Sequence, residues 1–299
     1  MADYREYRFR SACGALELFA RDYPGDSPAA PALLLMHGLT RNSADFEPMA
    51  QWLAGPYRLI VPDIRGRGLS QRDPVPANYR PDIYAGDMFA LLDGLGLDQA
   101  GLIGTSMGGM IAMTMAFIAA NNGTGNRIGP VVLNDIGPVI EAEGLGRIAG
   151  YVSETPAFAE WADAAAACEE NNRSAFPDFG EEDWMAFAQR TCKETAAGIV
   201  FAYDPAIAVP MLADGPDAGE SGAEADLWPL WPALDGHAVL VVRGEMSDLL
   251  SRATVVQMGQ RHGGPFAHVD VPERGHAPLL DEPDAVAAIT GFLARHYPA

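Results

Sequence analysis

The sequence predicts an α/β fold built on a mostly parallel sheet, and three observations lead to this prediction. Short, nearly continuous apolar runs recur along the chain, as is typical of strands buried on both faces. Helical patterns separate these runs, which implies parallel pairing with helices on both sides of the sheet. The 299 residues are 48% hydrophobic, which is sufficient for a substantial core.

The elements are expected in a regular order. The segments REYRFR and LELFAR predict an N-terminal hairpin. Buried strands are predicted at 32–38, 57–63, 100–105, 130–135, 238–244 and 266–273. Helices are predicted between and after them, at about 43–54, 82–95, 106–120, 251–262 and 283–296. The last of these ends on Arg295 and His296, two side chains that suit the negative end of a helix dipole.

One interval is much longer than a crossover requires. About a hundred residues separate Asp135 from Val239, where a dozen or so would be enough. Helical patterns occur there near 144–153, 157–172 and 181–195, together with Trp161, Trp184, Trp228 and Trp231, four of the five tryptophans. We expect a core domain (1–135 and 236–299) and a helical cap (136–235), called the predicted cap below. Its inner face is expected to line an apolar pocket, although a helical subdomain that buries its own aromatics would give the same pattern.

The composition excludes several classes of partner. The net charge is −20, and a chain this acidic is repelled by phosphate backbones and anionic lipids. No apolar stretch approaches the roughly 18 residues of a membrane span, and the charged N-terminus does not resemble a secretory signal. Cys13, Cys168 and Cys192 are scattered and lack metal-ligand spacing. We therefore expect a cytoplasmic monomer or homodimer with reduced thiols, no metal and no cofactor, acting on a small molecule.

The segment GLIGTSMGGM (101–110) places a serine between glycines, after a predicted strand and before a predicted helix. A serine on such a sharp turn stands clear of the sheet, and Gly104 and Gly108 remove side chains that would clash. The following helix points its N-terminus at the site, which favours developing negative charge. Ser106 is therefore the predicted nucleophile, and a tight structural turn is the alternative.

A nucleophile of this kind needs a base and an acid later in the chain. His276 lies in a loop just past the last predicted strand, where a parallel sheet presents catalytic groups. The acid is expected after the preceding strand, where Asp248 is preferred over Glu245. Asp270 and Asp135 are weaker choices, and Asp135 is expected to order the start of the predicted cap.

Backbone donors for an oxyanion are predicted beside Ser106. By the geometry of such a turn, the N–H of Met107, just after the nucleophile, faces the N–H of Leu39 at the end of another strand. His37 is then expected to brace this loop rather than to take part in chemistry.

With these motifs in place, the sequence resembles the α/β-hydrolase superfamily over nearly its whole length. The matching segments are HGL (37–39), DIRGRGLS (63–70), GTSMGG (104–109), RGEMSD (243–248) and RGHAP (274–278). The resemblance implies an eight-stranded sheet with a helical cap inserted after the sixth strand. It also implies that DIRGRGLS is a structural loop, so that Asp63 and Ser70 have no catalytic role.

The resemblance narrows the expected chemistry to a cofactor-free serine esterase acting on apolar or aromatic esters of modest size. Related dehalogenases and epoxide hydrolases use an aspartate where this chain has Ser106. Carbon–carbon hydrolases of meta-cleavage products usually carry a glycine-rich H-G-x-G-P loop and an aromatic residue after the histidine. This chain has HGLTRN and Ala277 instead, so carbon–carbon hydrolysis is the second hypothesis and a non-catalytic binder the third.

Overall fold

A computed structural model describes residues 2–153, 156–210 and 225–299 of the chain. Its centre is an eight-stranded sheet in the order β1-β2-β4-β3-β5-β6-β11-β12. The strands are β1 (Arg5–Arg10), β2 (Glu17–Tyr23), β3 (Ala32–Met36), β4 (Arg58–Asp63), β5 (Ala100–Thr105), β6 (Ile128–Asn134), β11 (Val239–Gly244) and β12 (Phe266–Val271). The β1–β2 and β2–β4 pairs are antiparallel and all the others parallel. The eight-stranded, mostly parallel sheet is therefore confirmed.

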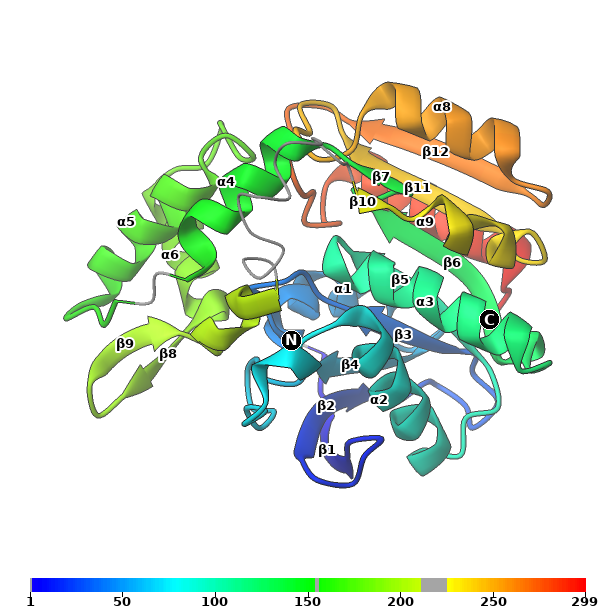
Figure 1. Cartoon of the computed structure of the whole chain (residues 1–299), viewed down its shortest axis with the longest axis horizontal. Coiled ribbons are helices and arrows are strands. Elements are labelled where there is room, and N and C mark those ends of the chain that lie inside the picture. Colours follow the sequence, from blue (N-terminus) through cyan, green and yellow to red (C-terminus); the bar gives the residue numbers. More distant parts are fainter. Residues whose placement is uncertain (1, 154–155, 211–224) are drawn as a thin grey trace.

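Helices cover both faces of this sheet (Figure 1). They are α1 (Glu47–Leu53), α2 (Pro81–Gly94), α3 (Met107–Asn121), α8 (Arg252–Arg261) and α9 (Pro283–His296). Side chains of α1 and α9 pack in one cluster with Leu33 and Leu35, whereas those of α2, α3 and α8 pack in another with Leu34 and Met36. Successive residues of β3 thus point to opposite faces. Because both faces are covered, the strands are continuously apolar.

The predicted cap lies between β6 and β11. Its described elements are β7 (Val139–Ile140), α4 (Ala142–Val152), α5 (Trp161–Asn172), α6 (Glu181–Thr191), β8 (Cys192–Thr195), β9 (Gly198–Phe201) and β10 (Ala225–Asp226). Figure 1 shows α4, α5, α6 and the β8–β9 hairpin gathered at one side of the sheet. The acidic stretch at 211–224 lies outside the described residues. The division into core and cap domains stays a prediction.

A helix predicted over 181–195 is partly wrong. Helix α6 ends at Thr191, and the chain then enters the β8–β9 hairpin. Gly198 has φ = +116°, a conformation open to glycine and strained for other residues, and it allows the chain to turn back here.

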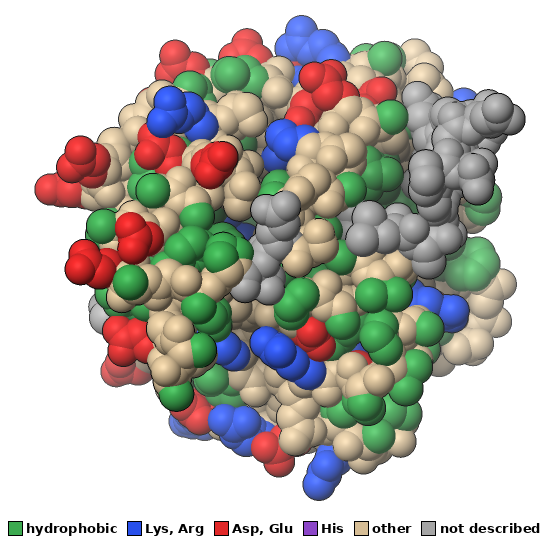
Figure 2. Space-filling model, turned by 60° about the vertical axis from the view of Figure 1, so that its left-hand side comes forward, with side chains coloured by type: hydrophobic (Ala, Val, Ile, Leu, Met, Phe, Trp, Pro, Cys, Tyr) green, Lys and Arg blue, Asp and Glu red, His purple; other side chains and the backbone are tan. Residues whose placement is uncertain are grey.

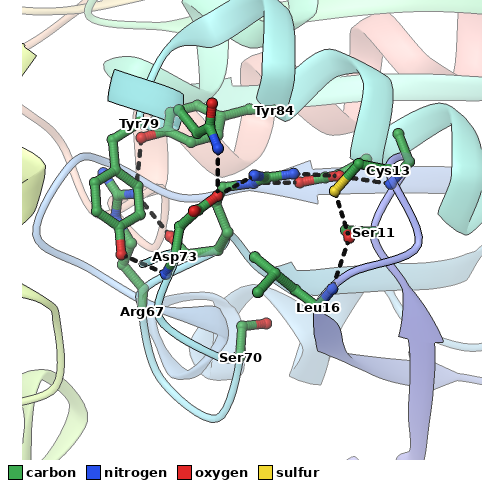
Figure 3. Close-up of polar contacts among 12 residues, drawn as sticks. Ser11, Cys13, Leu16, Arg67, Ser70, Asp73, Tyr79 and Tyr84 are labelled. Atoms are coloured by element: carbon green, nitrogen blue, oxygen red, sulfur yellow. Dashed lines mark hydrogen bonds and ion pairs between the residues drawn. The ribbon is translucent and has the colours of Figure 1, made fainter. Parts of the chain in front are cut away.

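A buried ion-pair network fixes the loop between β4 and α2. The guanidinium of Arg65 donates to Asp73 at 2.5 Å and to both carboxylate oxygens of Asp87 at 2.8 Å. In the close-up of Figure 3, the Tyr79 hydroxyl lies against this loop and accepts the backbone N–H of Asp73 at 2.8 Å. The same hydroxyl donates to Asp204 of the predicted cap at 2.7 Å. The loop therefore ties the sheet to the predicted cap.

The surface carries many acidic side chains, in agreement with the net charge of −20. Figure 2 shows acidic side chains along the left and upper edges of one face, with basic side chains between and below them. Within the described ranges, no helix combines the length and apolarity that crossing a membrane requires.

Candidate active site

Ser106 lies on a strained turn between β5 and α3. Its φ of 52° is positive, which is uncommon for a residue with a side chain. The turn leaves no space for side chains at the flanking glycines: a Cβ on Gly104 would lie 2.3 Å from the Gly108 carbonyl oxygen, and one on Gly108 would lie 2.0 Å from that of Met36. The glycines thus allow α3 to approach the sheet closely and leave the Ser106 hydroxyl accessible from a cleft.

The structure brings Ser106 and His276 together from positions 170 residues apart. His276 Nε2 lies 2.8 Å from Ser106 Oγ, and the imidazole is largely buried. The loop that carries His276 follows the carboxyl end of β12, next in the sheet to β11. An imidazole at this distance is placed to accept the hydroxyl proton.

The carboxylate on the other side of His276 belongs to Asp135. His276 Nδ1 lies 2.8 Å from Asp135 Oδ2, and the Asp135 side chain is fully buried. The pairing of His276 with Asp248 predicted from the sequence is therefore not the one in the structure. Asp135 follows β6 directly and has φ = +53°, and this sharp turn directs its carboxylate toward the loops after β11 and β12.

Two further donors hold the Asp135 carboxylate in place. Gly244 donates its backbone N–H to Oδ1 at 2.8 Å, and the Ser247 hydroxyl donates to Oδ2 at 2.6 Å. The loop after β11 therefore contributes Ser247 to this arrangement, one residue before the predicted acid. With His276, three donors surround an acceptor-only group, which matches an ionised carboxylate.

Asp248 instead forms an ion pair with Arg147 of α4. Arg147 donates to both carboxylate oxygens, Nε to Oδ2 at 2.6 Å and Nη2 to Oδ1 at 2.9 Å. Partial burial works to raise the pKa of the Asp248 carboxyl, but the bonds and charge of Arg147 outweigh it and hold that pKa below its ordinary value. The backbone oxygen of Asp248 also accepts the N–H of Gly144. Asp248 thus joins the predicted cap to the core.

Leu39, one of the two predicted oxyanion donors, lies at the same cleft as Ser106, and the other, Met107, directly follows Ser106 as the first residue of α3. Leu39 is one of the lining residues, and the Cβ position of its neighbour Gly38 lies 3.9 Å from Ser106 Cβ. Neither the Leu39 N–H nor the Met107 N–H donates to an acceptor within the described part of the chain. Arg67, labelled in Figure 3, contacts both residues: its Nε donates to the Leu39 oxygen at 2.9 Å, and its Nη2 lies 3.4 Å from Met107 Sδ.

His37 is fully buried and braces the loop after β3, as expected. Its Nδ1 lies 2.7 Å from the Gly38 oxygen, and its Nε2 accepts the Ile64 N–H at 3.0 Å. Burial lowers the pKa of His37 to about 3, and the nearby guanidinium groups of Arg67 and Arg41 act in the same direction. His37 is therefore neutral at ordinary pH, with its proton on Nδ1.

The cleft above Ser106 has a volume of about 620 Å³, counted with its open mouth. Its walls combine apolar side chains such as Ile148 and Phe176 with the polar groups of Arg41, Asp45 and Asn172. The tryptophans counted in the sequence are not among the lining residues. Trp184, for example, packs against neighbouring phenylalanines, and Trp231 packs against His262 and Phe266. In the described ranges, no three His, Cys, Asp or Glu side chains gather as a metal site would require.

Asn134 is a buried positioning group that the sequence reasoning missed. Its side-chain Nδ2 donates to Thr105 Oγ1 at 3.0 Å and to the Pro278 oxygen at 2.8 Å. Its backbone oxygen accepts the Ser106 N–H at 2.9 Å. It thus ties together the turns that carry Ser106, Asp135 and His276. The signal was present in the sequence, because two polar residues in succession, Asn134 and Asp135, end an otherwise apolar strand.

Comparison with known proteins agrees with this fold. Residues 33–289 match the model of the alpha/beta hydrolase family. The chain is 35% identical over 271 residues to a 3-hydroxybutyrate-oligomer hydrolase from Cupriavidus necator, covering 89% of each protein. It is 28% identical over 267 residues to a 2-(acetamidomethylene)succinate hydrolase from Mesorhizobium japonicum, covering 89% of this chain and 88% of the relative.

A solved structure gives the same result. The crystal structure of an alpha/beta hydrolase from Novosphingobium aromaticivorans superimposes with a TM-score of 0.86 at 40% sequence identity, covering 99% of each chain. The match of the family model to most of the sequence, together with this likeness, shows that the chain belongs to the alpha/beta hydrolase family.

Proposed function

We propose that this hydrolase cleaves carboxylic esters, with Ser106 as nucleophile, His276 as general base and Asp135 as the acid that orients it. The observation that carries the proposal is the continuous line of side chains, with 2.8 Å from Ser106 Oγ to His276 Nε2 and 2.8 Å from His276 Nδ1 to Asp135 Oδ2. At these distances the imidazole can accept the proton of the Ser106 hydroxyl, while the buried Asp135 carboxylate holds the imidazole in place.

In the acylation step, Ser106 Oγ attacks the ester carbonyl carbon while its proton passes to His276 Nε2. The carbonyl oxygen becomes an oxyanion, which accepts hydrogen bonds from the backbone N–H groups of Leu39 and Met107. The tetrahedral intermediate collapses, the bond to the alcohol oxygen breaks, and the alcohol takes the proton from His276. The product of this step is an ester between the acyl group and Ser106.

Deacylation repeats the proton transfers with water. His276 Nε2 accepts a proton from a water molecule, which attacks the acyl carbon. The carboxylic acid leaves, and the proton on His276 returns to Ser106 Oγ. Throughout, Asp135 accepts the Nδ1–H bond of His276, holds this tautomer and stabilises the imidazolium without taking its proton.

The substrate is a small ester. The relative from Cupriavidus necator is a hydrolase of 3-hydroxybutyrate oligomers, and such oligomers are joined by ester bonds, which favours ester over carbon–carbon cleavage for this chain. The mixed lining of the cleft, with Arg41 and Asn172 beside Phe176, supports a substrate with polar groups next to a short apolar segment. Ala277 follows His276, and this also favours ester chemistry over the meta-cleavage type.

The test uses nitrophenyl esters of short acyl chains, a vinylogous diketone and a fluorophosphonate probe. We expect turnover of the esters, labelling of Ser106 by the probe, and loss of both in Ser106→Ala. Turnover of the diketone alone would replace the proposal with carbon–carbon hydrolysis. A folded wild-type protein that neither labels nor turns over any ester would contradict catalysis by Ser106 and favour a binding protein.

A further inference from the structure

Arg41 is the cationic side chain of the cleft. Of the arginine and lysine residues that the structure describes, it alone lines the cleft with Ser106 and His276. It follows Gly38 by three residues, and its Cγ lies 3.6 Å from the Cβ position of that glycine. The Arg41 side chain is only 13% exposed, so its charge acts in a largely desolvated place, where an anion gains more from it than in water.

The guanidinium of Arg41 is held in place but not saturated. Nε and Nη2 both donate to the same oxygen of Asp45, Nε at 2.9 Å. One guanidinium face covers the ring of Phe187, with Cζ 3.8 Å from the ring centroid. Nη1 donates to no acceptor in the part of the chain that the structure describes. In Arg147, by contrast, Nε and Nη2 donate to two different oxygens of Asp248, so that this edge of the guanidinium is fully paired.

A second, smaller hollow adjoins the cleft at Arg41, and its volume is about 280 Å³ counted with its open mouth. The two hollows share Thr40, Arg41, Tyr151 and Asn172 as lining residues. Tyr151 lines both hollows, and burial raises the pKa of its phenol, so that it keeps its proton. Arg41, with its free donor edge, and Tyr151 therefore both line the space into which a substrate bound at Ser106 would extend.

We propose that Arg41, with Tyr151, binds a carboxylate of the substrate, so that the preferred substrates are esters that carry one free carboxylate near the scissile bond. The inference rests on the proposed esterase function. An arginine edge and a hydroxyl donor match the acceptor oxygens of a carboxylate. Asp45 competes for the same guanidinium and keeps it paired while the site is empty.

The experiment compares matched substrates that differ in charge. One pair places the charge on the alcohol side (3-butanoyloxybutanoate and its primary amide), and the other on the acyl side (monoethyl succinate and ethyl succinamate). Hydrolysis is followed by titration of the acid released. In the wild type we expect kcat/KM to favour the anion in at least one pair by about 10–100-fold, as for hydrogen bonds to charged groups.

Three variants assign that preference to Arg41. Arg41→Gln is expected to remove most of it, mainly through KM for the anion, and Arg41→Lys to restore part of it. Asp45→Asn frees the guanidinium and is expected to increase the preference. Arg173→Gln is the matched control, because Arg173 is 73% exposed, pairs with Glu169 one turn earlier in α5 and lines neither hollow. Circular dichroism checks that each variant is folded.

The outcomes separate this inference from the function on which it rests. Equal turnover of anion and amide by the wild type, or a preference that survives in folded Arg41→Gln, would overturn the carboxylate site and leave the esterase intact. Absence of Ser106-dependent hydrolysis with every ester would instead remove the esterase function. A preference that falls in Arg41→Gln and rises in Asp45→Asn supports the inference.

Discussion

The identity of the acid is the sharpest point to test, and Asp135→Asn is the substitution that tests it. The Asp135 carboxylate accepts from three donors: His276 Nδ1, Ser247 Oγ and the Gly244 N–H. An amide has one acceptor oxygen, so its NH₂ group must face donors on one side. If it faces His276, the imidazole turns to the tautomer that carries its proton on Nε2, and Nε2 then cannot accept the Ser106 proton.

The expected loss is large. The same substitution in a serine protease triad lowers kcat about 10⁴-fold because the wrong tautomer forms, which corresponds to about 5 kcal/mol of transition-state stabilisation. We expect a loss of this order in kcat with nitrophenyl esters, measured after active-site titration with a fluorophosphonate, and a much smaller change in KM.

Asp248→Asn is the matched control. It removes an ion pair in which Arg147 and Asp248 are 24% and 21% exposed, and such a pair contributes about 0.2–1 kcal/mol to the free energy of unfolding. We expect kcat within about tenfold of the wild type, since no bond to His276 is lost. If Asp248→Asn lost as much kcat as Asp135→Asn, or more, the assignment of Asp135 from the observed contacts would be refuted.

Three further predictions concern stability. Gly108→Ala places a Cβ 2.0 Å from the Met36 oxygen and should lower the free energy of unfolding by more than about 4 kcal/mol. Gly291→Ala in α9, where the new Cβ has nothing within 4 Å, should raise it by about 0.5–1 kcal/mol. Urea unfolding of both variants measures the difference. His37 binds a proton only in the unfolded chain between its ordinary pKa of 6.5 and its folded pKa of about 3, so its contribution falls by about 1.4 kcal/mol for each pH unit below 6.5. Unfolding of wild type and His37→Gln from pH 7 to 4 should show the smaller pH dependence in the variant. Arg65→Met leaves two buried carboxylates unpaired and should lower the free energy of unfolding by about 3–5 kcal/mol; equal stability would show that the carboxylates find other partners.

The sheet could be predicted from the sequence because strands buried on both faces are apolar at nearly every position. Segments such as 100–105 are apolar throughout, and the structure has β5 (Ala100–Thr105) at the same residues. The turn around Ser106 was also predictable, because only glycine fits at positions 104 and 108, two residues before and after it. The end of α6 was not, since the β8–β9 hairpin depends on Gly198 and on pairing that local helix propensity does not reveal.

The structure pairs His276 with Asp135 rather than with the predicted Asp248, and the reason is geometric. Two neighbouring strands, β6 and β11, are both followed by acidic residues, and either could reach a histidine after β12. The choice depends on the turn at Asp135, whose positive φ points the carboxylate at His276. Sequence spacing carries no such directional information. After β11, Ser247 rather than Asp248 faces the imidazole side, so an error of a single residue changes the assignment.

The short distance between Ser247 and Asp135 predicts that a carboxylate at position 247 can replace the one at position 135. Ser247 Oγ lies 2.6 Å from Asp135 Oδ2, the atom that contacts His276 Nδ1. A carboxylate introduced by Ser247→Asp therefore starts within reach of the imidazole, and in Asp135→Asn the new amide can donate to it. We expect the double variant Asp135→Asn/Ser247→Asp to recover at least about tenfold of the kcat lost in Asp135→Asn, or about 1.4 kcal/mol. Ser247→Asp alone should lose activity, because it places two carboxylates side by side. If the double variant folds like the wild type yet is no faster than Asp135→Asn, the requirement is for a carboxylate at the position just after β6 and not merely for negative charge beside Nδ1.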